Sequence, residues 1–330
     1  MLEHGGGLRQ AARDWSIAPE RWLDLSTGIN PNPWPVPPVP PEVWLRLPEI
    51  EDGLEDAART YYNAPHLLPA AGSQALIQTL PRLLPPGRVG ILSPTYGEHP
   101  QAWIRAGHRV LPLPPHQILD GPLPDLAALV VVNPNNPTGG RLPRELLLTR
   151  AAELASRDGW LVVDEAFMDP NPDQSLADAP PTPGLLVLRS LGKFFGLAGA
   201  RCGFLLAPPA LLNRVHQALG PWTLTGPTRF AARLALADHT WQAHTRTALA
   251  AASHRLAALL TAADLPPAGG TALFQWVPHP AARTLQALLA RQALLVRAFD
   301  HPSSLRFGLP PDEAGWQRLI QGLAALPRDP

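Results

Sequence analysis

The most constraining feature of the chain is a series of short apolar runs, each of which ends at a polar motif. In the middle of the sequence these runs cover 89–92, 126–132, 160–163 and 185–188. Between the second and third run, residues 144–157 repeat apolar side chains at helical spacing. Short runs that are almost wholly apolar indicate strands buried on both faces. The pattern predicts an α/β fold with a mostly parallel sheet, whose ligands bind beyond the carboxyl ends of the strands.

The two ends of the chain differ from this middle region. Residues 34–41 are too rich in proline for a helix or a central strand, so we expect an extended connector there. The last third changes to long Ala/Leu-rich helices followed by two strand-like segments. We therefore expect an N-terminal arm and connector at 1–45, a large ligand-binding domain at 46–215 and a small α+β domain at 216–330. In this last third, helices are expected at about 207–219 and 228–263, and strands at 272–277 and 304–308.

Charge and cysteine content exclude several classes of protein. The 330 residues include 27 Lys plus Arg and 27 Asp plus Glu, so the chain has no net positive charge that would attract nucleic acid or an anionic membrane. The single cysteine, Cys202, excludes an intrachain disulfide framework and fits a reducing compartment. The chain begins without a secretory signal pattern, and no apolar run approaches the length that spans a bilayer. We expect a soluble, cytoplasmic protein.

Residues 189–203 carry the clearest chemical signal. They place Lys193 eight residues before Arg201 among small and apolar residues. Such surroundings strip hydration from the amine and make it a better nucleophile, able to form a Schiff base with an aldehyde. The planar arginine suits a phosphate. An aldehyde and a phosphate together describe pyridoxal 5'-phosphate (PLP). Taken alone, a lysine and an arginine beside a glycine-rich turn are more often solvated surface charges.

Two polar residues after neighbouring apolar runs fit the same cofactor. Asn136 lies in a turn, 133–140, where its amide could donate to the ring hydroxylate of PLP. Asp164 could pair with the protonated pyridine nitrogen, although an aspartate there could also cap a helix. Asn136 and Asp164 are 28 residues apart, and Asp164 and Lys193 are 29 apart. Each interval fits one strand–helix–strand crossover, which predicts that the three residues follow adjacent strands.

Further candidates for the cofactor site lie upstream. The turn Gly72-Ser73-Gln74 opens a predicted helix whose first amides could bind a phosphate, or it could be an ordinary N-cap. Tyr96 follows an apolar run and could stack on a flat heteroaromatic ring, or could be a buried structural tyrosine.

Two arginines in the C-terminal third are candidates for binding a substrate. Arg306 lies in the strand-like segment 304–308, and Arg297 precedes it by nine residues. Isolated arginines are usually surface residues. Two of them near one site would suit a substrate with two anionic groups, such as a carboxylate and a phosphate.

Asn136, Asp164, Lys193 and Arg201, in this order and spacing, resemble the fold-type I PLP enzymes of the aspartate aminotransferase superfamily. The resemblance covers nearly the whole chain. It implies that Lys193 binds the cofactor aldehyde and Asp164 its ring nitrogen, while Asn136 contacts the ring hydroxyl and Tyr96 stacks on the ring. The residues implied for the cofactor phosphate are Gly72, Ser73, Gln74, Ser190 and Arg201.

The chain departs from the superfamily pattern at two positions. Phe167 stands where many relatives have a tyrosine that bonds the ring oxygen. Gly192 stands just before the lysine, where a hydroxyl residue is common, so one phosphate contact is missing. The Phe167 departure is shared with a narrower group of relatives.

That narrower group is the threonine-phosphate decarboxylase family of cobalamin biosynthesis. The motifs that resemble it are His4-Gly5-Gly6, residues 23–31, residues 164–167 and Arg189-Ser190-Leu191. Some members have a substrate-binding asparagine at the position of Gly28. Glycine has no side chain to make that contact, so only a contact from the Gly28 backbone is expected here. The substrate-binding residues that the resemblance implies are His4, Gly5, Gly28, Asn136, Arg297 and Arg306.

The resemblance implies PLP-dependent decarboxylation of L-threonine O-3-phosphate and a homodimer. Arg306 matches the superfamily's carboxylate-binding arginine, and His4 and Arg297 are candidates for the phosphate, but the sequence does not decide which arginine binds which anion. Histidinol-phosphate aminotransferase is the alternative, although the tyrosine-proline pair typical of that family is Leu47-Pro48 here. A non-catalytic module of the same fold would need a lost lysine or an added DNA-binding segment, and neither is seen.

Overall fold

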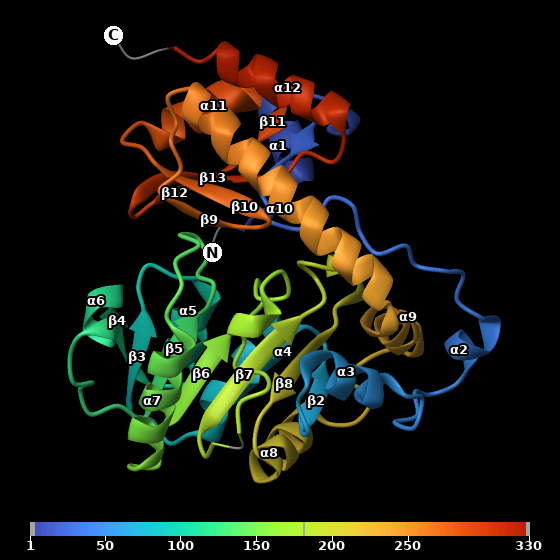
Figure 1. The fold of residues 1–330 in the computed structure, drawn as a ribbon, viewed down its shortest axis with the longest axis vertical. Coiled ribbons are helices and arrows are strands. Elements are labelled where there is room, and N and C mark those ends of the chain that lie inside the picture. The colour runs from blue at the N-terminus through green and yellow to red at the C-terminus, as the bar shows by residue number, and fades with distance from the viewer. Residues whose placement is uncertain (1–3, 181, 328–330) are drawn as a thin grey trace. The chain divides into compact units, whose positions relative to one another are not determined.

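The chain forms two compact units in the computed structural model, which describes residues 4–180 and 182–327 (Figure 1). The central unit comprises 33–136 and 141–243. The terminal unit comprises 1–32, 137–140 and 244–330, so it joins both ends of the chain.

A seven-stranded sheet of order β2-β8-β7-β6-β5-β3-β4 forms the middle of the central unit (Figure 1). The neighbours from β7 to β4 pair in parallel, whereas β8 runs antiparallel to both β7 and β2. This sheet confirms the predicted α/β class. Its strands are β2 (Leu67–Ala70), β3 (Arg88–Leu92), β4 (Arg109–Leu113), β5 (Ala128–Val132), β6 (Trp160–Asp164), β7 (Leu185–Ser190) and β8 (Gly203–Leu206).

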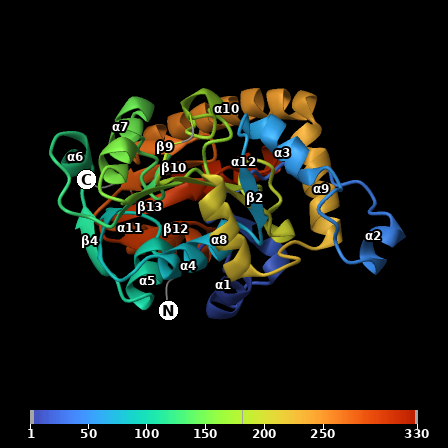
Figure 2. The same ribbon diagram turned by 90° about the horizontal axis from the view of Figure 1, so that it is seen from below.

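Helices cover both faces of this sheet. β5, β6 and β7 are buried at every position, which explains why their sequences are almost wholly apolar. Figure 2 shows α4, α5 and α8 on one face and α3 and α7 on the other. The helices of the central unit are α2 (Pro41–Leu45), α3 (Leu54–Tyr62), α4 (Ser73–Thr79), α5 (Glu98–Arg105), α6 (Pro115–Leu119), α7 (Arg144–Ala155), α8 (Pro209–Leu219) and α9 (Gly226–Ala237).

The terminal unit is built on a four-stranded antiparallel sheet of order β12-β13-β10-β9. The N-terminal arm joins this unit because β1 (Leu23–Asp24) pairs in parallel with β11 (Leu294–Leu295). The other elements of the unit are α1 (Leu8–Trp15), β9 (Gly269–Thr271), β10 (Phe274–Pro278), α11 (Ala282–Arg291), β12 (Arg297–Asp300), β13 (Ser303–Gly308) and α12 (Glu313–Ala324). The long helix α10 (His239–Ala262) contributes residues to both units.

The structure differs from the sequence prediction at the helix expected over 228–263. This segment forms two helices, α9 and α10, because the chain leaves helical geometry at Asp238 (φ −87°, ψ 75°). The Asp238 carboxylate accepts hydrogen bonds from Trp34 Nε1 at 3.1 Å and from Trp241 N at 3.0 Å. It therefore caps the start of α10, which an aspartate does better than an apolar residue. Short 3₁₀ turns occupy Pro19–Arg21, Leu80–Leu83, Pro172–Gln174 and Ala198–Ala200.

Within residues 4–180 and 182–327, none of the helices combines the length and the apolarity that crossing a membrane requires.

Candidate active site

The polar motifs predicted from the sequence lie at one edge of the central sheet. Asp164 and Ser190 are the last residues of the adjacent strands β6 and β7. The Asn133–Asn136 turn directly follows β5, the other neighbour of β6. Because these three strands are parallel, their carboxyl ends share an edge. The sheet therefore brings Asn136, Asp164 and the lysine loop together, as their spacing predicted.

Asp164 is buried and has a histidine partner. Its Oδ2 lies 2.9 Å from His99 Nε2, and its Oδ1 accepts a hydrogen bond from Ala166 N at 3.0 Å. His99 lies in α5, and its side chain is 1% exposed. These contacts offset the cost of burying a carboxylate and fix its orientation. His99 could not be predicted from the sequence, since a buried histidine on a covering helix looks like any other core residue.

Tyr96 belongs to a hydrogen-bonded group with Gln74 and Glu98. Its hydroxyl donates to Gln74 Oε1 at 3.3 Å, and Gln74 Nε2 donates to Glu98 Oε2 at 2.8 Å. Burial, together with the charges of Glu98 and Asp164, raises the pKa of Tyr96 to about 12. The phenol therefore stays protonated at neutral pH. Because the Gln74 side chain is engaged here, a phosphate contact from this residue would come from its backbone amide.

Gly72, Ser73 and Arg201 form a cradle for an anion. Gly72 has a φ of 76° at the start of α4, and a Cβ atom there would lie 2.7 Å from Arg201 Nη2. Gly203 is equally constrained, since its Cβ would lie 2.6 Å from Ser73 N. The guanidinium is held by a hydrogen bond from Arg201 Nη1 to Ala198 O at 3.2 Å. Amides of a helix start and a fixed cation thus converge as phosphate binding requires.

Lys193 lies in a loop that aromatic packing holds in place. Its neighbours Phe194 and Phe195 are fully buried, and the Phe195 ring stacks on Trp241 with centroids 5.6 Å apart. Phe195 O also accepts a hydrogen bond from Trp34 N at 2.9 Å. Lys193 Nζ lies 5.4 Å from the centroid of the Phe167 ring. Phe167, which departs from the superfamily's tyrosine, therefore offers the ammonium its π face.

The backbone before this loop turns at Ser190 and Gly192. Ser190 Oγ accepts a hydrogen bond from Gly192 N at 3.2 Å, and both residues are buried. The serine hydroxyl thereby stabilises the turn that leads into Lys193 and keeps its own proton available for another acceptor.

A buried ion-pair network lies beside the same strand ends. Arg189 Nη1 donates to Glu165 Oε2 at 2.6 Å, and Nη2 donates to Asp169 Oδ1 at 2.5 Å. Ser175 Oγ donates to Glu165 as well, and Tyr61 donates to Asp169 at 3.1 Å. Glu165 follows Asp164 directly, and Arg189 is four residues before Lys193. The network therefore ties the end of β7 to the segment after β6.

In the terminal unit, Arg297 and Arg306 lie opposite each other on the adjacent strands β12 and β13. They are direct partners in the antiparallel pairing of β12 and β13. Arg306 is buried, and its Nη2 donates to Ser26 O at 2.6 Å. Burial and the charge of Arg297 lower the pKa of Arg306 to about 10. Two like charges held in register attract an anion that neutralises them.

The N-terminal candidates lie in the same unit. Gly6 N donates to Ser26 Oγ at 2.8 Å, which holds the segment His4-Gly5-Gly6 against residues 24–26. Gly28 is buried and has a φ of 68°, a conformation that favours glycine. Its amide nitrogen would lie 3.6 Å from a Cβ atom at Gly308.

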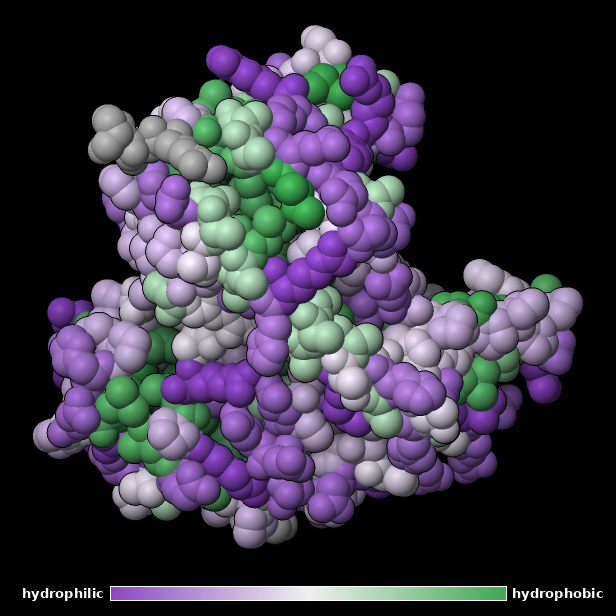
Figure 3. All heavy atoms as spheres, turned by 45° about the horizontal axis from the view of Figure 1, so that its top comes forward, coloured by the Kyte–Doolittle hydropathy of each residue, from purple (hydrophilic) through white to green (hydrophobic). Residues whose placement is uncertain are grey.

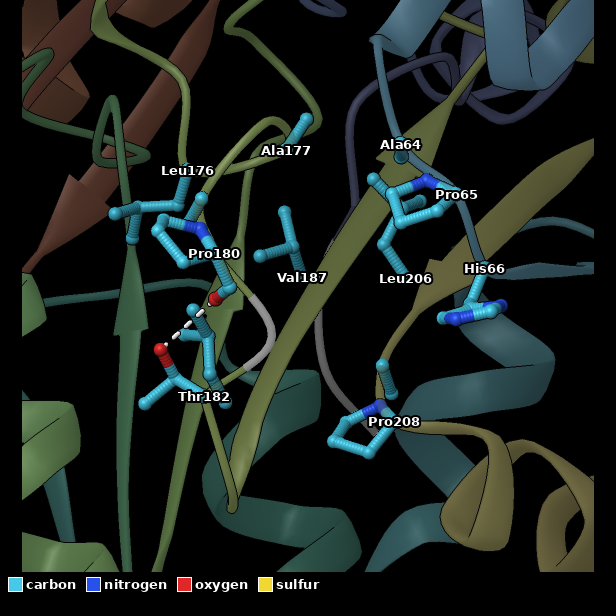
Figure 4. A pocket seen from close by; sticks show the side chains of 13 residues that line it. Ala64, Pro65, His66, Leu176, Ala177, Pro180, Thr182, Val187, Leu206 and Pro208 are labelled. Atoms are coloured by element: carbon cyan, nitrogen blue, oxygen red, sulfur yellow. Dashed lines mark hydrogen bonds between the residues drawn. The ribbon is translucent and has the colours of Figure 1, made fainter.

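A separate apolar pocket in the central unit does not share this chemistry (Figure 4). Its cavity volume is about 50 Å³, and it lies where β7 begins and β8 ends, at the opposite ends of those strands from Ser190 and Gly203. The hydrogen bond from Thr182 Oγ1 to Pro180 O, 2.9 Å long, lies within its wall (Figure 4). The pocket is too small and too apolar to hold a phosphorylated cofactor.

Comparison with known proteins identifies the family. Residues 45–323 match the model of the family "Aminotransferase class I and II". The chain belongs to the aminotransferase class I and II family. This confirms the superfamily predicted from Asn136, Asp164, Lys193 and Arg201.

The chain is similar to two sequence relatives and to one solved structure. It is 54% identical over 323 residues to a threonine-phosphate decarboxylase of Pseudomonas aeruginosa PAO1, covering 98% of this chain and 97% of that one. A histidinol-phosphate aminotransferase of Shewanella amazonensis is 33% identical over 285 residues, covering 78% of this chain and 76% of its own. The structure of the Sinorhizobium meliloti histidinol-phosphate aminotransferase in complex with pyridoxal-5'-phosphate has a TM-score of 0.80 at 20% identity, covering 99% and 96% of the two chains. That similarity confirms the fold.

We predict that Glu165→Gln destabilises the protein by about 3 kcal/mol, because it leaves a buried guanidinium without one of its two anionic partners. Asp56→Asn is the matched control, since the Arg59–Asp56 pair lies on the surface, with side chains 44% and 83% exposed. Urea denaturation of both variants and the wild type measures the difference. Equal midpoints for the two variants would show that the buried network adds no stability.

Proposed function

We propose that this chain is a PLP-dependent decarboxylase that converts L-threonine O-3-phosphate into (R)-1-aminopropan-2-yl phosphate and CO2 in cobalamin biosynthesis. The observation that carries the proposal is the register pair of Arg297 and Arg306, two cations suited to a substrate with both a carboxylate and a phosphate. The 54% identity to a threonine-phosphate decarboxylase over 98% of the chain supports it.

The residues at the edge of the central sheet fit PLP. The cradle formed by Gly72, Ser73 and Arg201 requires a glycine at position 72, because a Cβ atom there would clash with Arg201. It offers hydrogen-bond donors for the cofactor phosphate. We propose Gln74, through its amide, and Ser190 as further phosphate ligands. Asp164, oriented by His99, would bind the pyridine nitrogen and favour its protonated form. The remaining proposed contacts are Asn136 with the ring hydroxyl, Tyr96 with the ring face and Lys193 with the aldehyde.

Bound there, PLP supplies an electron sink for the bond broken at the substrate α carbon. The protein groups decide which bond that is. His4, Gly5, Gly28, Asn136, Arg297 and Arg306 are the proposed substrate ligands. The cationic side chains among them bind the substrate's two anionic groups and so orient its carboxylate for departure as CO2. Lys193 Nζ then delivers a proton to the α carbon, where the carboxylate was attached.

Histidinol-phosphate aminotransferase is the second candidate. The Shewanella amazonensis histidinol-phosphate aminotransferase is 33% identical over 78% of the chain, whereas the Pseudomonas aeruginosa threonine-phosphate decarboxylase is 54% identical over 98% of it. Histidinol phosphate also has only one anionic group, its phosphate, whereas threonine phosphate offers two anionic groups to the two arginines. Both observations favour the decarboxylase.

We predict that purified protein with added PLP releases CO2 from threonine phosphate without a keto acid, and that Lys193→Ala abolishes this release. Lys193 is required because the proposed mechanism uses its amine both to hold the cofactor and to return the proton. CO2 capture and chromatography of the amine product measure the reaction. Turnover of histidinol phosphate that depends on a keto acid, with no CO2 from threonine phosphate, would favour the aminotransferase instead.

We predict that the apparent affinity for threonine phosphate falls as pH rises through about 10. Arg306 has a lowered pKa of about 10, so its guanidinium attracts an anion below that pH and loses its charge above it. Arg306→Gln should raise KM about 10- to 100-fold at pH 8, since a charge-assisted hydrogen bond is worth about 1.5–3 kcal/mol. KM measured from pH 8 to 11 tests both effects, and the variant should lack the step near pH 10. A step of the same size in the variant would assign it to another group.

We propose a homodimer, on the basis of an exposed apolar segment around α2. Trp44, Leu45, Leu47 and Ile50 are 66%, 83%, 65% and 77% exposed. Figure 3 shows hydrophobic residues on the projection that this segment forms at the right of the view. Clusters of large apolar side chains on a surface mark protein interfaces. A second copy of the chain would cover this exposed cluster in the proposed dimer.

We predict that the double variant Leu45→Asp and Ile50→Asp sediments as a monomer, because each substitution would bury a charge in the proposed interface. Glu49→Gln, within the same exposed segment, is the control and should leave the dimer intact. Sedimentation velocity at micromolar concentration makes the comparison. A monomeric wild type would contradict the proposed dimer.

Two further assignments complete the proposal. The proposed cofactor ligands all fall in 46–215, and the proposed substrate ligands other than Asn136 fall in 1–45 and 216–330. We therefore propose these three segments as functional divisions, which follow the ligand each contacts and not the two compact units. A cytoplasmic location is proposed because the one cysteine, Cys202, is a buried free thiol.

A further inference from the structure

Ser26 occupies a buried position just after β1, and its side chain is fully engaged. Its backbone N and its Oγ both donate to Asp24 Oδ1, at 2.9 and 2.6 Å. Oγ also accepts the hydrogen bond from Gly6 N at 2.8 Å. A serine hydroxyl has one proton, and here that proton is committed to Asp24. The hydroxyl therefore organises its neighbours and does not donate to a ligand.

The carbonyl of the same residue contacts the buried arginine. Ser26 O accepts the hydrogen bond from Arg306 Nη2 at 2.6 Å. Gly5 packs against this carbonyl so closely that a Cβ atom on Gly5 would lie less than 3.0 Å from Ser26 O. Ser26 thus contacts the N-terminal segment through its hydroxyl and Arg306 through its carbonyl.

The backbone around Ser26 is held from two sides. Leu25 N donates to Leu295 O at 2.8 Å, which continues the pairing of β1 with β11. Gly308 N donates to Leu25 O at 2.7 Å, at the end of the strand that carries Arg306. The C-terminal strands therefore fix the position of Ser26. Ser26 in turn holds residues 4–6 in place through its hydrogen bond from Gly6 N.

We propose that Ser26 is a positioning residue that couples the order of the segment His4-Gly5-Gly6 to the orientation of the Arg306 guanidinium. The proposal rests on the proposed function, in which this segment and Arg306 bind the anionic substrate. Ser26 itself does not touch substrate. Its hydroxyl holds the segment in place, and its carbonyl directs the arginine, so the substrate meets both groups already arranged.

The test compares Ser26→Ala with Ser303→Ala in the full-length protein with PLP. Ser26→Ala removes the hydroxyl that accepts from Gly6 N but keeps the carbonyl that accepts from Arg306. Ser303→Ala is the matched control, since it also deletes a serine hydrogen bond in the terminal unit, from Oγ to His279 O at 2.7 Å. Two readouts are followed: hydrogen exchange of the Gly6 amide by mass spectrometry, and KM and kcat for threonine phosphate.

Ser26→Ala should speed exchange of the Gly6 amide and raise KM, each about three- to tenfold, the range that one lost hydrogen bond gives. kcat should change less than KM, and Ser303→Ala should leave both readouts near wild type. Unchanged exchange overturns the proposal, as does faster exchange without a change in KM. Equal effects in Ser303→Ala also overturn it, because they would reflect general loosening of the unit.

A second pair of variants covers the case in which Ser26→Ala does not fold. Gly5→Ala places a methyl group against Ser26 O, whereas a Cβ atom on Gly7 meets nothing within 4 Å. Gly5→Ala should therefore raise KM and speed Gly6 exchange, and Gly7→Ala should do neither. Equal behaviour of the two variants contradicts the coupling.

The exchange readout needs no substrate, which separates this proposal from the proposed function. If wild-type protein releases no CO2 from threonine phosphate, the proposed function fails. The Kd of inorganic phosphate, measured by calorimetry, then replaces KM as the anion readout. Faster Gly6 exchange with weaker phosphate binding in Ser26→Ala still supports the coupling, and either effect without the other overturns it.

Discussion

The buried guanidinium of Arg189 is the interaction on which the candidate site depends. It binds Glu165 and Asp169 in surroundings where its side chain is 2% exposed and both partners are fully buried. An unpaired charge at such a place would be very costly, so the three residues can only be buried together. Their backbone positions follow from this. Glu165 directly follows Asp164, and Arg189 lies four residues before Lys193, so this one electrostatic requirement aligns two parts of the site.

Most of the fold and several site residues could be predicted because their signals are local. β5, β6 and β7 are buried on both faces, and the resulting apolar runs are visible without any knowledge of their partners. β2 and β4 were missed because each contains a proline, Pro69 or Pro112, and lies at an edge of the sheet, where proline is tolerated. The break at Asp238 was missed since one of its partners, Trp34, is 204 residues away.

The same distinction applies to the site. Lys193, Asp164 and Asn136 stand out because polar residues directly after apolar strands are conspicuous, and regular intervals connect them. His99 has no such signal, since its partner Asp164 is 65 residues away and its helix is otherwise ordinary. Ser26 was visible within residues 23–31, but its role emerges only from contacts with Gly6 and Arg306, the second 280 residues away. Residues that orient others are thus the hardest to find from sequence.

The antiparallel direction of β8 has a consequence for the cofactor site. A parallel neighbour of β7 would begin at the far edge of the sheet, and the chain would need a helix to return there. β8 instead begins at the edge where β7 ends, so residues 191–202 form one local connection that holds both Lys193 and Arg201. Lys193 and Arg201, the groups proposed for the cofactor's aldehyde and phosphate, therefore lie on the same short loop. The covalent length of that loop therefore limits how far apart the two groups can lie.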